Sequence, residues 1–374
     1  MRNSTPLSLV LITAILGSAS WLSCSSDSPS TDGAGAQPQA GSGGSAGDDQ
    51  DAAPDTTAVG GAAGTGGAAG TGGAAGTGGA AGTGGTAGTA GQGGGGATTC
   101  DTFQKGVNKD FMVDGVAREF ILNLPDGVES GGPWPVVFNW HGLGDTATNM
   151  NGLISSIYND AAFPFIGVTP EDSNFTVLGN SVDWDVFQVN ATTNREARLF
   201  DEILACLEKR YTVDANHVHS MGFSLGSILT DMLGTIRGDR LASIATYSGG
   251  YFSDADNVAT LGMLSSMVNW PAPTHTNAYG QVILFGGPTD TVSFGGIPVK
   301  FDVFAANDTK YLNGLGHDLI VCNHAQGHSA PAPGFTGKQI VEFFKAHPKG
   351  TVASPYATGL PADYPAYCAF NPKS

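Results

Sequence analysis

Residues 217–227 have the sequence HVHSMGFSLGS, in which a strand-like run leads into Gly222, Ser224 and Gly226. A helix-like stretch follows, so the pattern predicts a strand, a tight turn at Ser224 and a helix. A Cβ at either glycine would collide with neighbouring backbone in such a turn. A serine that stands clear of a sheet in this way is typical of a nucleophile. The start of the helix would aim the N–H of Leu225 at a developing oxyanion.

Apolar runs on both sides of this motif alternate with helix-like segments. Strands are expected over residues 118–125, 135–141, 165–170, 217–223, 244–247, 282–285 and 319–322. Thr193 and Glu196 have the spacing of a capping box that opens an amphipathic helix, and a second such helix is expected over 339–346. This alternation predicts an α/β fold with a mainly parallel sheet covered by helices on both faces. Ligands of such sheets bind beyond the carboxyl ends of the strands.

The strand expected over 135–141 ends in the sequence WHGLG, residues 140–144. Gly142 permits a close approach, so the backbone N–H of Leu143 is the expected second donor to an oxyanion. We interpret His141 as a structural residue, because the loop needs its backbone N–H and not an imidazole.

The acid of a catalytic triad is expected at Asp290, in a loop directly after the strand that ends at Phe285. Such a loop suits a carboxylate that orients an imidazole. Asp302 and Asp318 compete for this role, but Asp302 lies in a strand-like segment and Asp318 begins another. Both are therefore interpreted as surface residues.

The general base is expected at His328, which follows Gly327 just past the last strand. The order Ser224, Asp290, His328 is one of the known orders of serine-hydrolase triads. His324 competes for the role but is expected to belong to the strand end. The pair His324 and His328 lacks a third ligand, so no metal site is predicted. The remaining histidines are interpreted as strand or surface residues: His217, His219, His275, His317 and His347.

Several further segments occur in the same order as in a known family. They are REFILNLPDG (118–127), PVVFNWHGLG (135–144), KRYTVDANHVHSMGFSLGS (209–227), ASIATYSGG (242–250) and FGGPTDTV (285–292). Together they resemble a family of secreted α/β-hydrolase esterases that includes feruloyl esterases, acetylxylan esterases and polyhydroxybutyrate depolymerases. The resemblance implies the α/β-hydrolase fold, carboxylic ester hydrolysis without a cofactor, and a triad of Ser224, Asp290 and His328. The chain departs from the family at Ser227, where a glycine is usual.

The first 99 residues differ in composition from the rest of the chain. Arg2 precedes an apolar run over residues 7–17 that is typical of an export signal and too short to span a bilayer. Cys24 follows, and the site resembles a bacterial lipoprotein cleavage site; the alternative is an ordinary signal peptide cut near Ala19. From residue 60 to 89 the hexamer GGAAGT repeats five times, with one Thr for Ala, and offers no apolar face to bury.

These features divide the chain into three expected parts. Residues 1–23 are a signal peptide, 24–99 a disordered linker, and 100–374 an esterase domain. Lipidation of Cys24 would leave four cysteines, which are expected to form two disulfides in an exported protein: Cys100, Cys206, Cys322 and Cys368. Three pairings are possible, and the sequence does not choose among them.

Charge limits the partners of the domain. The chain has 33 acidic and 16 basic residues, a net charge of −17, which argues against binding to nucleic acid or to anionic lipid. We expect a monomer that takes an ester substrate, which can be polymeric, and that reaches a membrane only through a lipid anchor. Two other interpretations are an inactive tethered domain that binds carbohydrate or acts in adhesion, and a peptidase on the same fold.

Overall fold

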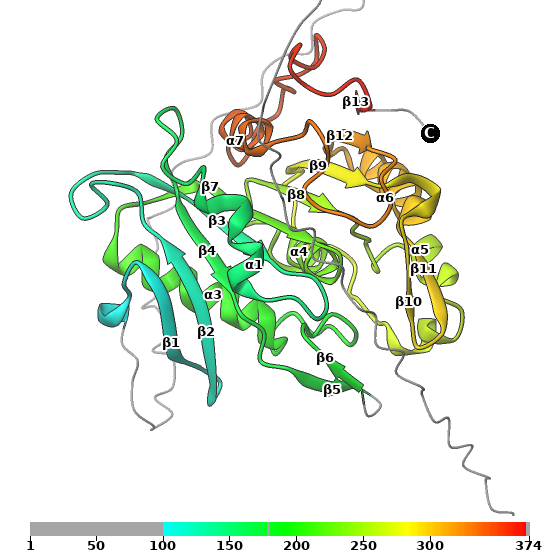
Figure 1. Cartoon of the computed structure of the whole chain (residues 1–374), viewed down its shortest axis with the longest axis horizontal. Coiled ribbons are helices and arrows are strands. Elements are labelled where there is room, and N and C mark those ends of the chain that lie inside the picture. The colour runs from blue at the N-terminus through cyan, green and yellow to red at the C-terminus, as the bar shows by residue number, and fades with distance from the viewer. Residues whose placement is uncertain (1–99, 178–179, 372–374) are drawn as a thin grey trace, which may run out of the picture. The chain divides into compact units, whose positions relative to one another are not determined.

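A nine-stranded mixed sheet forms the centre of the chain from Cys100 onward (Figure 1). The computed structural model describes residues 100–177 and 180–371, so the predicted signal peptide, linker and Cys24 lie outside the described residues. The strands lie side by side in the order β1 (Gly106–Val113), β2 (Val116–Asn123), β4 (Ile166–Pro170), β3 (Trp134–Trp140), β7 (Val213–Phe223), β8 (Ser243–Tyr247), β9 (Gly280–Phe285), β12 (Asp318–Asn323) and β13 (Cys368–Phe370).

The strands from β4 to β12 in this order are parallel, and antiparallel strands flank them. β1 pairs with β2, β2 with β4, and β12 with β13 in antiparallel fashion, whereas all pairs between β4 and β12 are parallel. The predicted α/β fold with a mainly parallel sheet is confirmed.

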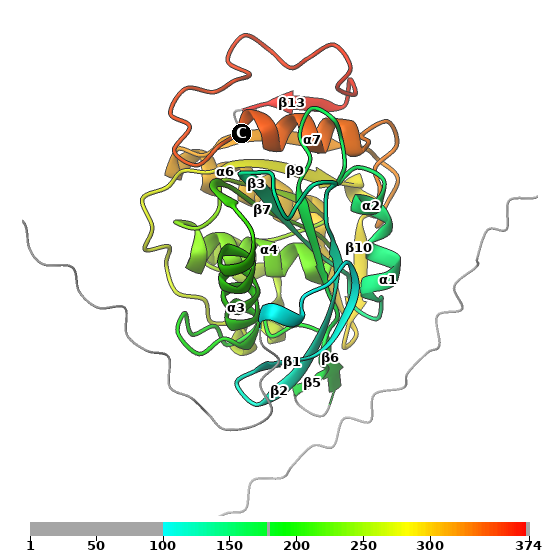
Figure 2. The same cartoon turned by 90° about the vertical axis from the view of Figure 1, so that its left-hand side faces the viewer.

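Helices cover both faces of this sheet. They are α1 (Ala147–Met150), α2 (Gly152–Ser155), α3 (Arg195–Arg210), α4 (Leu225–Arg237), α5 (Ala255–Thr260), α6 (Phe301–Leu315) and α7 (Gly337–Ala346). Short 3-10 helices occur at η1 (Cys100–Thr102), η2 (Gly262–Met267) and η3 (Gly287–Thr289). Two small two-stranded sheets pair β5 (Phe175–Val177) with β6 (Asn180–Val182) and β10 (Thr291–Phe294) with β11 (Ile297–Lys300). Figure 2 shows α3 and α4 on one side of the sheet and α1 and α2 on the other.

The central strand β3 contributes to both layers of the core. Val136, Phe138 and Trp140 pack with side chains of α3 and α4. The intervening Val137 belongs to the core cluster on the opposite face, which includes side chains of α7. All four side chains are fully buried, as expected for a strand that is covered on both sides.

Three local predictions were wrong. The side chain of Asn194, not Thr193, caps α3 by accepting the N–H groups of residues 196 and 197, and Glu196 instead forms a buried ion pair with Arg118 at 2.7 Å. Asp302 lies in the first turn of α6 and not in a strand. Two histidines interpreted as strand or surface residues, His317 and His347, are buried next to the strands.

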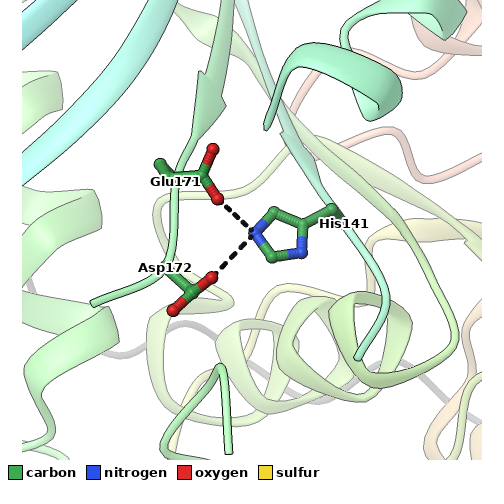
Figure 3. A group of neighbouring side chains, drawn as sticks. All are labelled: His141, Glu171 and Asp172. Atoms are coloured by element: carbon green, nitrogen blue, oxygen red, sulfur yellow. Dashed lines mark ion pairs between the residues drawn. The ribbon is translucent and has the colours of Figure 1, made fainter. Parts of the chain in front are cut away.

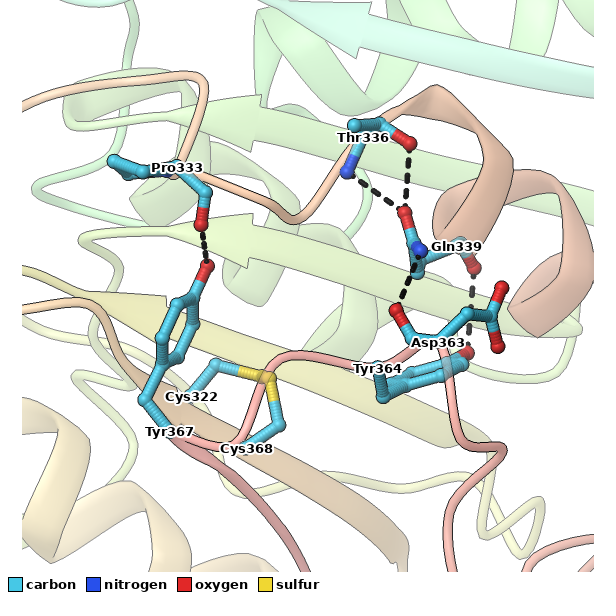
Figure 4. The surroundings of a disulfide bond; sticks show 8 residues. All are labelled: Cys322, Pro333, Thr336, Gln339, Asp363, Tyr364, Tyr367 and Cys368. Carbon is cyan, nitrogen blue, oxygen red and sulfur yellow. Dashed lines mark hydrogen bonds between the residues drawn. A yellow bond between two sulfur atoms is a disulfide. The ribbon is translucent and has the colours of Figure 1, made fainter. Parts of the chain in front are cut away.

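The four cysteines of the described chain form two disulfides, as predicted. Cys100 pairs with Cys206, which ties η1 to α3, and Cys322 pairs with Cys368, which ties β12 to β13. Beside the second bond, the hydroxyl of Tyr367 donates to the carbonyl of Pro333 (Figure 4). The carboxyl-terminal segment is therefore fastened to the loop that follows β12. Within the described ranges, none of the helices has the length and apolar character needed to cross a membrane.

Candidate active site

Ser224 occupies a strained turn between β7 and α4. Its backbone has φ 55° and ψ −119°, a region that few non-glycine residues adopt. A Cβ built on Gly222 would lie 2.3 Å from the carbonyl oxygen of Gly226, and one on Gly226 would lie 2.2 Å from the carbonyl oxygen of Trp140. Both glycines are thus required for the turn, as the sequence predicted.

Ser227 replaces the glycine that is usual in the family, and it has a clear structural role. Its Oγ lies 2.5 Å from the carbonyl oxygen of Gly222 and 2.9 Å from that of Tyr247, and it also accepts the N–H of Tyr247. The hydroxyl therefore connects the first turn of α4 to the ends of β7 and β8, which stabilises the position of the turn.

The structure brings the side chains of Ser224, His328 and Asp290 into one hydrogen-bonded chain. Nε2 of His328 lies 2.9 Å from Oγ of Ser224, and Nδ1 lies 2.7 Å from Oδ1 of Asp290. Asp290 is fully buried. Its other oxygen accepts hydrogen bonds from the Ser248 hydroxyl and the Gly286 N–H, both at 2.7 Å. These bonds hold the carboxylate in a position where it can orient the imidazole.

The loop that carries His328 folds back over the end of β9. Gly327 has φ 68°, and its N–H donates to the carbonyl of Gly286. The imidazole lies between two aromatic rings, stacked on Phe301 with 4.8 Å between centroids and tilted against Phe223 at the same distance. These contacts restrict the orientations that the ring can adopt.

His324 lies one residue past the end of β12 and is placed differently. It is only 5% exposed, and its N–H donates to the carbonyl of Phe285. Its Nδ1 accepts the N–H of Gln326, and its Nε2 has no hydrogen-bond partner among the residues the structure describes. Burial lowers the pKa of His324, which favours a neutral ring.

The expected second oxyanion donor lies beside the serine. A Cβ on Gly142 would approach that of Ser224 to 3.3 Å, so the loop containing Leu143 passes next to Ser224. In the part of the chain that the structure covers, the N–H groups of Leu143 and Leu225 donate to no backbone or side-chain acceptor. Both are free to bind an anionic oxygen.

His141 precedes this loop and is fully buried against acidic side chains (Figure 3). Its Nδ1 lies 2.9 Å from the carbonyl oxygen of Gly142, and its Nε2 lies 3.4 Å from Glu171 and 3.7 Å from Asp172. Burial is the largest single effect and works against the charged ring, but the interactions with Glu171, the Gly142 carbonyl and Asp183 together outweigh it, and the pKa of His141 is raised. Neither carboxylate was predicted from the sequence, although both directly follow the strand that ends at Pro170.

Glu171 and a further carboxylate, Asp183, also hold the loop that follows His141. Oε2 of Glu171 accepts the N–H of Ala147 at 3.0 Å, and Oδ2 of Asp183 accepts that of Gly144 at 2.7 Å. The side chains of Trp140 and Trp184 are fully buried and that of Trp270 is nearly so, which makes all three part of the core.

Curated proteins of known activity include relatives of this chain. It is 26% identical over 160 residues to feruloyl esterase D of Neurospora crassa, which is 41% of this chain and 52% of that protein. It is 24% identical over 253 residues to the probable feruloyl esterase C of Aspergillus flavus, which is 65% of this chain and 80% of that protein. The resemblance to feruloyl esterases is confirmed. The chain spans about half the length of the first of these relatives, and no protein-family profile matches it.

Solved structures support the fold. The crystal structure of native pOPH aligns with a TM-score of 0.58 at 16% identity, over 73% of this chain and 96% of that one. Native sOPH aligns with a TM-score of 0.57 at 18% identity, over 72% and 94% of the two chains. At these identities the likeness concerns the fold alone.

Proposed function

We propose that the chain is an exported serine esterase that hydrolyses carboxylic esters. The observation that carries this proposal is the hydrogen-bonded chain from Ser224 through His328 to Asp290. It lies at the carboxyl ends of parallel strands, where ligands of such sheets bind. The names of the feruloyl esterase relatives point to the same reaction class.

The geometry suits a two-step reaction with a covalent intermediate. Oγ of Ser224 attacks the ester carbonyl while Nε2 of His328 removes its proton, and Asp290 stabilises the resulting imidazolium. The N–H groups of Leu225 and Leu143 stabilise the anionic oxygen of the tetrahedral intermediate. The imidazolium protonates the departing alcohol, and water activated by the same imidazole then releases the acid. The reaction requires no cofactor.

The substrate class is proposed from the relatives. Feruloyl or acetyl esters of plant polysaccharide are favoured, with polyhydroxyalkanoate polyester as a further polymeric substrate. The two disulfides of the domain are typical of proteins in an oxidising compartment, which supports export. Attachment through lipid on Cys24, with residues 24–99 as a tether, is part of the same proposal.

A panel of ester and amide substrates tests the proposal. It contains short-chain nitrophenyl esters, methyl ferulate, acetylated xylan, polyhydroxybutyrate and a peptide amide. We expect turnover of at least one ester class, and a loss of about 10³-fold or more in Ser224→Ala. The matched control is Ser266→Ala, which changes an exposed serine and should retain full activity. Binding of xylan without turnover would support the inactive binding domain instead, and faster cleavage of the amide would support a peptidase.

A further inference from the structure

One ring nitrogen of His141 has no conventional partner although the side chain is fully buried. Nδ1 lies 2.9 Å from the Gly142 carbonyl oxygen, which only accepts, so Nδ1 carries a proton. Nε2 has no hydrogen-bond partner within the described residues, yet it points at the carboxylates of Glu171 and Asp172 (Figure 3). In a neutral ring, Nε2 would direct its lone pair at two negative charges.

The two carboxylates are held in place by their other oxygens. Oε2 of Glu171 accepts the N–H of Ala147 at 3.0 Å, and Oδ1 of Asp172 accepts the N–H of Asn174 at 2.7 Å. This leaves Oε1 of Glu171 and Oδ2 of Asp172 facing Nε2 of His141. The three facing atoms lie within 4.8 Å of one another.

The two separations from Nε2 of His141 match those between the ligands of a small divalent cation. Tetrahedral zinc with bonds of about 2.0–2.2 Å places its ligand atoms about 3.3–3.6 Å apart. The observed distances from Nε2 are 3.4 Å to Glu171 and 3.7 Å to Asp172. Metal-binding histidines usually donate their second N–H to a carbonyl or carboxylate, and Nδ1 of His141 has this arrangement with Gly142.

Charge favours a dication over a proton. Asp183 is a third carboxylate at this place, 3.8 Å from Nδ1 of His141. A singly charged imidazolium would balance only one of the three carboxylates, whereas a dication bound to the neutral ring would balance two.

We propose that His141, Glu171 and Asp172 bind one divalent transition-metal cation, and that this cation joins the end of β3 to the end of β4. One nitrogen and two oxygen ligands indicate zinc as the cation. His141 directly precedes Gly142 and Leu143, so the cation would also fix the loop that is proposed to bind the oxyanion. Only this consequence rests on the proposed function. The binding of the metal does not.

Zinc binding to the whole chain tests this proposal without an activity assay. The protein is stripped with EDTA, dialysed and titrated with Zn²⁺ by calorimetry, and its melting temperature is measured with and without Zn²⁺. We expect one site, and a rise in melting temperature of about 5 °C at a hundredfold excess over Kd. The double variant Glu171→Gln/Asp172→Asn should bind at least a hundredfold more weakly. The control His324→Ala, which removes a buried histidine outside the proposed site, should bind zinc as tightly as the wild-type chain does.

Two results would overturn the proposal. One is the absence of a zinc site in the wild-type chain, together with an Nε2 proton on His141 in ¹⁵N NMR spectra. The other is undiminished zinc binding in the double variant. Should that variant not fold, Co²⁺ bound to the wild-type chain keeps the test decisive, because a four-coordinate site with nitrogen and oxygen ligands gives intense visible bands and an octahedral aquo ion does not. Ester turnover is not a readout here, so failure of the proposed function is distinguishable.

Discussion

Replacing His328 and His324 singly by alanine separates the proposed general base from its neighbour in sequence. His328→Ala removes both the 2.9 Å contact to Ser224 and the 2.7 Å contact to Asp290. Loss of a triad member costs about 10³-fold or more in kcat, which corresponds to about 4 kcal/mol of transition-state stabilisation. His324 contacts neither partner through its ring, so we expect His324→Ala to lose less than about tenfold.

The assay is steady-state hydrolysis of one activated nitrophenyl ester, with circular dichroism and melting temperature as controls for folding. His324 is buried, so His324→Ala should lower the melting temperature although kcat falls by less than about tenfold. A larger loss of kcat in His324→Ala than in His328→Ala, with both variants folded, would refute the assignment of the base. It would also contradict the geometry of the loop after β12.

Three further predictions concern stability and attachment. Burial raises the pKa of Asp308 to about 7, so the folded state holds a proton that the unfolded state releases near pH 4. The melting temperature should therefore fall from pH 5 to pH 8, and Asp308→Asn should weaken this dependence on pH. An unchanged dependence of the melting temperature on pH in Asp308→Asn would contradict this prediction. Replacing Cys322 and Cys368 by serine should lower the free energy of unfolding by about 2–4 kcal/mol in denaturant titrations. It should also reduce kcat, because the segment that contains β13 holds the loop after His328. Equal stability of the variant and the wild-type chain would argue against the disulfide. Cys24→Ser should move the protein from the membrane fraction to the soluble fraction, and unchanged fractionation would argue against lipidation.

The sequence predicted those parts of the fold that depend on local pattern. The strand before Ser224 and the roles of Gly222 and Gly226 can be predicted from the sequence around Ser224 alone. The reason is local, because the turn leaves no room for a Cβ at either glycine. Asp290 and His328 could be proposed because each follows an apolar strand, and parallel strands bring such loops to one edge. Their contact is a consequence of the strand order.

Contacts between distant segments account for two of the failures, the cap of α3 and the missed carboxylates. Either Thr193 or Asn194 can cap a helix, and the choice of Asn194 accompanies the buried pairing of Glu196 with Arg118, which is remote in sequence. Asp302 was misassigned because apolar and polar residues alternate around it, although the segment packs as a helix. The carboxylates facing His141 were missed because their partner lies at the end of another strand.

Covalent labelling by a fluorophosphonate tests the central claim most directly, because the reagent reacts only with a serine that is activated as a nucleophile. The wild-type chain is treated with the reagent and digested, and the modified peptide is identified by mass spectrometry. We predict one adduct per chain, located on Ser224, with labelling slowed by a factor of about 10³ in His328→Ala. Ester hydrolysis that continues without an adduct, or with the adduct on another residue, would contradict the account.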